Sequence, residues 1–166
     1  MWFDTSAVYL TSSSATGDYP LTAFDGALRN ACIADFNLIR VTSIVPSGTP
    51  IRRLVSQKQI SGNGLLIPAV YESIRSDKIG TVISVAVGVG VAEQSPGLIF
   101  SYRCDDTESK ARSALKEMIR ESMAKKGISD FKLKIASASA KVVQPWTCVF
   151  AAAVFCDSQL EEVLHS

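Results

Sequence analysis

Histidine is almost missing from this sequence of 166 residues: the single one, His165, is one residue from the C-terminus. A Ser-His-Asp or Cys-His arrangement, or a metal site built on histidine, would have to use this terminal segment. The four cysteines are widely spaced and form no Cys-x-x-Cys pair, which indicates neither a zinc site nor a required disulfide framework. We therefore expect no metal ion in this protein.

Runs of like charge and long apolar segments are missing as well. The net charge is +1 and charged residues make up 20% of the chain, so no feature indicates a nucleic-acid or anionic-membrane partner. No apolar stretch is long enough to span a bilayer, and residues 1–4 have neither the basic region nor the apolar run of a signal peptide. We expect a cytoplasmic protein that binds neither nucleic acid nor membrane.

Hydrophobic residues, by contrast, are plentiful at 47% of the chain. A chain of this length can bury the core of one domain, so we expect a single domain over residues 1–166. The remaining apolar surface would suit an oligomer interface.

Apolar periodicity predicts helices over residues 22–34 and 106–127. Segments rich in β-branched and other apolar residues predict strands at 7–10, 37–45, 65–71, 81–91, 98–102, 131–138 and 148–155. The polar run at 11–18 is predicted to be a loop and 62–64 a turn, while 51–59 is ambiguous. Several strands follow one another without a helix between them, which favours an α+β layered sandwich over a doubly wound α/β fold.

Few polar residues remain as candidates for chemistry. They are Asp25 in the first predicted helix, Asn37, and the pair Thr42-Ser43 within the strand predicted at 37–45. Taken alone, each is an ordinary residue for its predicted element.

Several segments, taken in their order and spacing, resemble a known family. They are Pro-Leu-Thr-Ala-Phe-Asp-Gly-Ala-Leu at 20–28, Asn-Leu-Ile-Arg-Val-Thr-Ser-Ile-Val-Pro at 37–46, Leu-Ile-Pro-Ala-Val-Tyr at 66–71, Ser-Asp at 76–77, Thr-Val-Ile-Ser at 81–84 and Cys-Val-Phe-Ala-Ala-Ala at 148–153. From about residue 10 to residue 155, the chain resembles the pyruvoyl-dependent arginine decarboxylases. The resemblance implies a layered αββα-type sandwich and a homotrimer, or a dimer of trimers, with active sites between subunits.

The resemblance also implies that the chain makes its own cofactor. The Ser43 hydroxyl would attack the Thr42 carbonyl, and elimination from the resulting ester would leave a pyruvoyl group at a new N-terminus. The Asn37 amide would stabilise the oxyanion of the first step. Two associated chains would result, a β-chain of residues 1–42 and an α-chain of residues 43–166.

A small-molecule substrate, arginine or a related amino acid or amine, is the implied partner. Its amine would form a Schiff base with the pyruvoyl group, which then draws electrons from the bond that breaks. Asp25 would bind the guanidinium group through paired hydrogen bonds. Leu21 and Phe36 are the further substrate-binding positions that the resemblance implies.

One position departs from the family pattern. Where the family has a glutamate that returns a proton to the substrate carbon, this sequence has Ser101. A hydroxyl is a far weaker acid, and the loss of a positioned general acid typically costs a factor of about 10²–10⁴ in rate. Tyr102 and Glu93 are the nearby residues that could replace it.

Three functions remain open at this point. The first is a pyruvoyl-dependent decarboxylase of arginine or a related amino acid, which releases agmatine or a similar amine. The second is a diverged enzyme that directs imine or enamine chemistry to Mannich-type carbon–carbon bond formation in a biosynthetic pathway. The third is an uncleaved relative that does not decarboxylate. Cleavage between Thr42 and Ser43 separates the third function from the other two.

Overall fold

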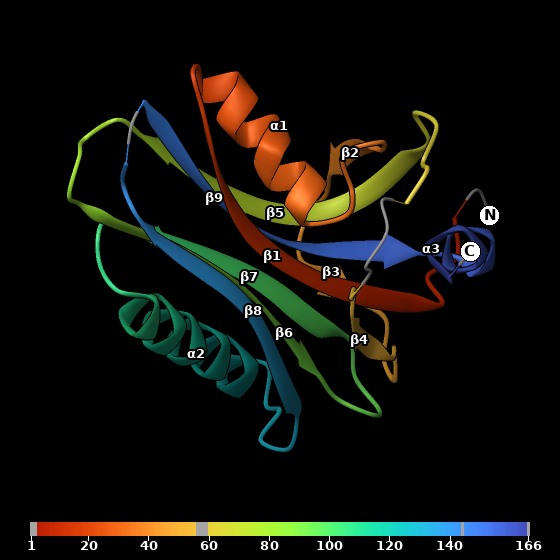
Figure 1. Ribbon diagram of the computed structural model, residues 1–166. Coiled ribbons are helices and arrows are strands. Elements are labelled where there is room, and N and C mark those ends of the chain that lie inside the picture. The colour runs from red at the N-terminus through yellow and green to blue at the C-terminus, as the bar shows by residue number, and fades with distance from the viewer. Residues whose placement is uncertain (1–2, 56–59, 144, 166) are drawn as a thin grey trace.

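Two packed β-sheets, each covered by a helix, form the structure (Figure 1), a computed structural model that describes residues 3–55, 60–143 and 145–165. The five-stranded sheet has the order β2-β5-β9-β1-β4, and the four-stranded sheet has the order β3-β7-β6-β8. The elements are β1 (Ala7–Gly17), α1 (Pro20–Asn30), β2 (Asn37–Arg40), β3 (Ile44–Val45), β4 (Ile51–Arg53), β5 (Leu66–Ser76), β6 (Val82–Val91), β7 (Gly97–Cys104), α2 (Glu108–Lys125), β8 (Lys132–Lys141), β9 (Trp146–Cys156) and α3 (Ser158–His165).

Each layer buries its own apolar cluster. Helix α1 packs on the outer face of the five-stranded sheet over a cluster that includes Ala27 and Phe150. Helix α2 packs on the outer face of the four-stranded sheet over Leu115 and Ile119. A third cluster, here called the inter-sheet core, lies between the two sheets and includes Val87. The predicted αββα-type sandwich is thus confirmed.

Strand β9 lies at the centre of the five-stranded sheet. It pairs antiparallel with β1 on one side and with β5 on the other. Both of its faces are covered, by α1 and by the second sheet, so its side chains from Thr147 to Cys156 are all buried. This explains the nearly continuous apolar run from which the strand was predicted.

The loop predicted at residues 11–18 is wrong, because β1 continues to Gly17 in unbroken register with β9. Its polar side chains find partners outside the strand. The Ser13 hydroxyl donates to the Ala27 carbonyl of α1 at 2.6 Å, and the Ser12 hydroxyl donates to the Ser137 carbonyl of β8 at 2.8 Å. The serines therefore join β1 to both neighbouring layers.

Both predicted helices are present, with shifted ends. Helix α1 begins at Pro20, because Tyr19 is the N-cap and Thr22 accepts a hydrogen bond from the Tyr19 amide at 3.0 Å. Helix α2 begins at Glu108, and the Thr107 side chain accepts from the Lys110 amide. The predictions had placed Thr22 and Asp106 at these starts.

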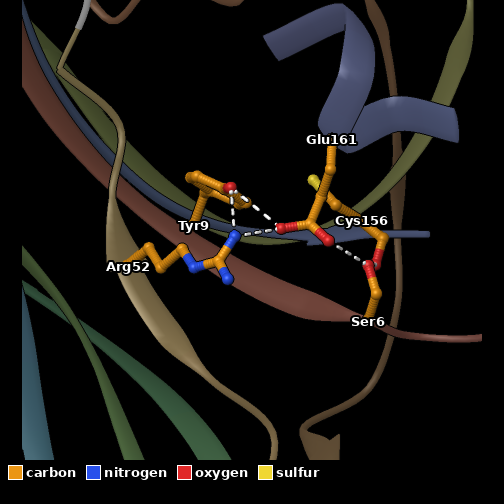
Figure 2. A network of polar contacts seen from close by, with 5 residues as sticks. All are labelled: Ser6, Tyr9, Arg52, Cys156 and Glu161. Carbon is orange, nitrogen blue, oxygen red and sulfur yellow. Dashed lines mark hydrogen bonds and ion pairs between the residues drawn. The ribbon is translucent and has the colours of Figure 1, made fainter. Parts of the chain in front are cut away.

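Helix α3, which the sequence patterns did not predict, is joined to the sheet by a polar network (Figure 2). The Glu161 carboxylate accepts hydrogen bonds from the Ser6 hydroxyl at 2.7 Å and the Tyr9 hydroxyl at 3.0 Å, and it pairs with Arg52. Arg52 in turn donates to the Tyr9 oxygen at 3.0 Å. Burial raises the pKa of Tyr9, so its hydroxyl keeps the proton that it donates.

Candidate active site

The strand predicted over residues 37–45 is two strands in different sheets. Strand β2 pairs parallel with β5, and β3 pairs antiparallel with β7. Residues 41–43 cross from one sheet to the other, and they belong to no strand. The bond between Thr42 and Ser43 therefore lies in irregular backbone between the two sheets.

Hydrogen bonds to both sheets fix the two ends of residues 41–43, here called the crossing. The Val41 amide donates to the Ala69 carbonyl of β5 at 3.2 Å, and the Ile99 amide of β7 donates to the Ser43 carbonyl at 2.7 Å. Between these anchors Thr42 is exposed and Ser43 is half-buried. Within the described part of the chain, the Thr42 carbonyl and the Ser43 hydroxyl make no hydrogen bond. The Thr42 carbonyl and the Ser43 hydroxyl thus lie between two anchored backbone groups and have no partner among the described residues.

Ser101 lies beside this crossing. It is two residues beyond Ile99 on β7, roughly 7 Å along a strand, and side chains two apart share a face. Ile99 packs in the inter-sheet core, as does Val87, the partner of Ser101 on β6. The structure thus brings Ser101 and Ser43 to the same edge of the inter-sheet core.

Asn37 lies away from the bond within one chain. It begins β2, and its side-chain amide donates to the Gly64 carbonyl at 2.8 Å. The Thr42-Ser43 pair follows the opposite end of β2, more than about 10 Å away at the usual rise of a strand. One copy of the chain therefore does not bring Asn37 to the bond between Thr42 and Ser43.

The three predicted substrate-binding residues lie on the outer side of the five-stranded sheet. Leu21 is 70% exposed on α1. Asp25 is exposed on the same helix and forms an ion pair with Arg29. Phe36 is buried in the cluster beneath α1. Within one chain, these residues are not gathered around Ser43.

A carboxylate that the sequence patterns did not place lies on β5, one of the two strands that anchor the crossing. Glu72 of β5 forms an ion pair with Arg103 of β7, at 3.7 Å between Oε1 and Nη1. The strand predicted at 65–71 ended one residue too early to include Glu72. Continuing that strand's alternation past Tyr71 would have placed Glu72 on the same face as Val70.

The two buried cysteines do not point to another centre. Burial raises the pKa of Cys148 to about 11 and that of Cys156 to about 12, which suits core residues rather than nucleophiles. No three His, Cys, Asp or Glu side chains gather within metal-binding reach among the residues that the structure describes. A surface hollow of about 490 Å³ lies between the loop after β6 and the segment before β8; Glu93 lines it, and the other candidate site residues do not.

Comparison with known proteins identifies the family. The family model described as pyruvoyl-dependent arginine decarboxylase matches residues 7–160. This chain belongs to that family. It is 34% identical over 150 residues to the pyruvoyl-dependent arginine decarboxylase of Methanocaldococcus jannaschii, covering 89% of this chain and 88% of the relative.

Two further relatives in the family bear the same name. The protein of Thermococcus kodakarensis is 32% identical over 142 residues, covering 85% of this chain and 88% of its own. The protein of Pyrococcus abyssi is 31% identical over 154 residues, covering 92% of this chain and 96% of the relative. Among the described helices, none is long and apolar enough to cross a membrane.

Proposed function

We propose that this family member cleaves itself between Thr42 and Ser43 and then decarboxylates arginine to agmatine. The observation that carries the proposal is the sheet crossing, which anchors Val41 and Ser43 and leaves the Thr42 carbonyl and the Ser43 hydroxyl without hydrogen bonds in the described chain. The names of the relatives support arginine as the substrate. None of them indicates carbon–carbon bond formation, so the Mannich-type alternative is not proposed.

The bonds that form and break in self-cleavage are those of Thr42 and Ser43. The Ser43 oxygen adds to the Thr42 carbonyl carbon, the C–N bond breaks, and the Ser43 nitrogen takes the proton. Elimination then releases residues 1–42 as a carboxylate and leaves a dehydroalanine at residue 43. The dehydroalanine takes up water and loses ammonia, which leaves a ketone on residue 43. That ketone supplies an electron sink for the bond to the substrate carboxylate.

The remaining residues act between copies in this proposal. Asn37 lies too far from Ser43 of its own chain to contact it. Asp25 lies on the outer side of the five-stranded sheet, away from Ser43 of its own chain. Exposed apolar side chains on α1, β3 and β5 suit a homotrimer or a dimer of trimers, in which they would be covered: Leu21 at 70%, Ile44 at 54% and Leu66 at 64%. A neighbouring copy would then present Asn37 to the scissile bond and Asp25 to the guanidinium group. We expect the assembly to act in the cytoplasm.

Release of carbon dioxide from carboxyl-labelled arginine tests this function. Wild-type protein should release it and form agmatine, whereas Ser43→Ala should remain uncleaved and inactive. Cleaved wild-type protein that releases nothing from arginine would contradict the substrate. A gain on Ser101→Glu in that case would show that the pocket accepts arginine but lacks its acid.

A further inference from the structure

Arg40, the last residue of β2, lies directly before the crossing. Strand β2 is four residues long and lies at the edge of the five-stranded sheet, next to β5. The end of a short edge strand frays readily, because a neighbouring strand supports it on one side only. Opening of this end would shift Thr42 relative to the Ser43 hydroxyl.

Two contacts with Tyr71 hold the Arg40 side chain to β5. The guanidinium donates to the Tyr71 carbonyl oxygen at 2.8 Å, and its Cζ lies over the Tyr71 ring, 4.0 Å from the centroid. That ring packs beside the buried Phe150, with 5.9 Å between the ring centroids. A planar guanidinium suits this double contact, because it can stack on a ring while an N–H group in its plane reaches an acceptor. Arg40 is therefore held by a ring that is itself packed against the core.

Arg40 and Val41 fix the start of the crossing from opposite faces of the five-stranded sheet. Arg40 alternates with Leu38, which packs with Tyr71 in the cluster beneath α1. Val41 packs against the inter-sheet core. A side chain on each face, together with the hydrogen bond from the Val41 amide, therefore limits how the chain before Thr42 can rotate.

We propose that Arg40 is a positioning residue for self-cleavage: held by Tyr71, it fixes the end of β2 so that the Thr42 carbonyl carbon stays within reach of the Ser43 hydroxyl. This role rests on the self-cleavage proposed above. The attack closes a small ring through the nitrogen, Cα and Cβ of Ser43, and such a ring forms only over a narrow range of backbone torsions. Fixing both ends of the crossing keeps the backbone in that range before the new bond forms.

The Arg40→Met substitution tests this role, because it keeps an unbranched stem and removes the guanidinium. We expect the folded variant to cleave about 10- to 100-fold more slowly, since a misplacement of about 1 Å at reacting groups can cost about 100-fold in rate. Arg40→Lys keeps a cation but lacks the planar fork, so its rate should lie between those of Arg40→Met and wild type.

Arg75→Met is the matched control. Arg75 is also exposed and also lies over an aromatic ring, 5.1 Å from the centroid of Phe24, but it is near the end of β5 that is remote from the crossing. This variant should cleave at the wild-type rate. A loss equal to that of Arg40→Met would overturn the proposal, because removal of any stacked surface cation would then suffice.

The backbone ester gives a readout that a loss of stability alone would not change. Under mild conditions hydroxylamine cleaves an ester far faster than an amide, and cleavage at this ester gives fragments that meet at Thr42 and Ser43. Hydroxylamine-dependent cleavage of folded protein should fall in Arg40→Met by about the same factor as self-cleavage. A wild-type level of ester with slow self-cleavage would overturn the proposal, because Arg40 would then act on the later elimination.

The wild-type protein separates this inference from the proposed self-cleavage. Wild-type protein that cleaves, with folded Arg40→Met protein that cleaves at the same rate, contradicts the role of Arg40 alone. Wild-type protein that never cleaves contradicts both. If Arg40→Met does not fold, Arg40→Lys decides: a folded variant that cleaves more slowly than wild type supports the role, and one that matches wild type overturns it.

Discussion

Gly97, the first residue of β7, determines how closely that strand approaches β6. A Cβ atom added at Gly97 would lie 2.2 Å from the Gly90 carbonyl oxygen and 3.2 Å from the Val91 Cα. Both contacts are with backbone, so no side-chain rotation can relieve them. The strands would have to separate by about 0.8 Å to bring the Cβ to 3.0 Å, the shortest contact that such atoms normally show.

The separation of β7 from β6 would occur next to the residues of β7 that anchor the Thr42–Ser43 bond. Gly97 pairs with Val45 of β3, and the Ser43 carbonyl is held by Ile99 two residues further along β7. Overpacking of this kind typically costs about 1–3 kcal/mol, which the fold can tolerate. A misplacement of about 1 Å at reacting groups can cost about 100-fold in rate. We therefore expect Gly97→Ala to fold but to cleave about 100-fold more slowly.

The rate is measured by following the appearance of the two fragments in freshly translated protein. Gly90→Ala is the control, because its Cβ would meet the Ile119 and Phe131 side chains at 3.1 and 3.4 Å, on the α2 face. These contacts lie on the face of β6 opposite the inter-sheet core, so this variant should cleave at close to the wild-type rate even where it loses stability. Folded Gly97→Ala protein that also cleaves at the wild-type rate would refute the reasoning.

Three further substitutions or treatments test other parts of the structure. Tyr9→Phe keeps the buried ring but removes its hydrogen bond to Glu161, so denaturant titration should show a loss of about 1–3 kcal/mol in unfolding free energy; no loss would contradict the network's role. Asp25→Asn should weaken agmatine binding to uncleaved protein about tenfold or more in calorimetry, and unchanged affinity would exclude it as the guanidinium site. Because burial disfavours their thiolates, with pKa values of about 11 and about 12, Cys148 and Cys156 should resist alkylation at pH 8 until the protein is denatured; rapid labelling of native protein would contradict their burial.

The parts of the fold predicted well from sequence are those whose pattern is local. Helix α2 has its apolar stripe within its own residues and its N-cap, Thr107, directly before them, and β9 is apolar because both of its faces are covered. Strand β1 was missed beyond Leu10 because serines in sequence look like a loop. Its extension depends on pairing with β9, which is more than 100 residues away in the chain.

In the candidate site, too, some features follow from the local sequence and others depend on pairing with distant strands. The Thr42-Ser43 pair was found by family resemblance, but apolar content alone could not show that the chain changes sheets there. The β-branched and apolar residues on both sides of the pair are typical of one continuous strand. The chain is divided there because β2 pairs with β5 and β3 pairs with β7. Glu72 lies beyond the end predicted for its strand, because β5 continues along β9 as far as Ser76.

The mass of the purified, denatured protein tests the central claim most directly. We predict two fragments, residues 1–42 and residues 43–166, with the larger one reactive toward a carbonyl reagent. A single species at 17.8 kDa that never converts would contradict the self-made cofactor and the decarboxylase function with it.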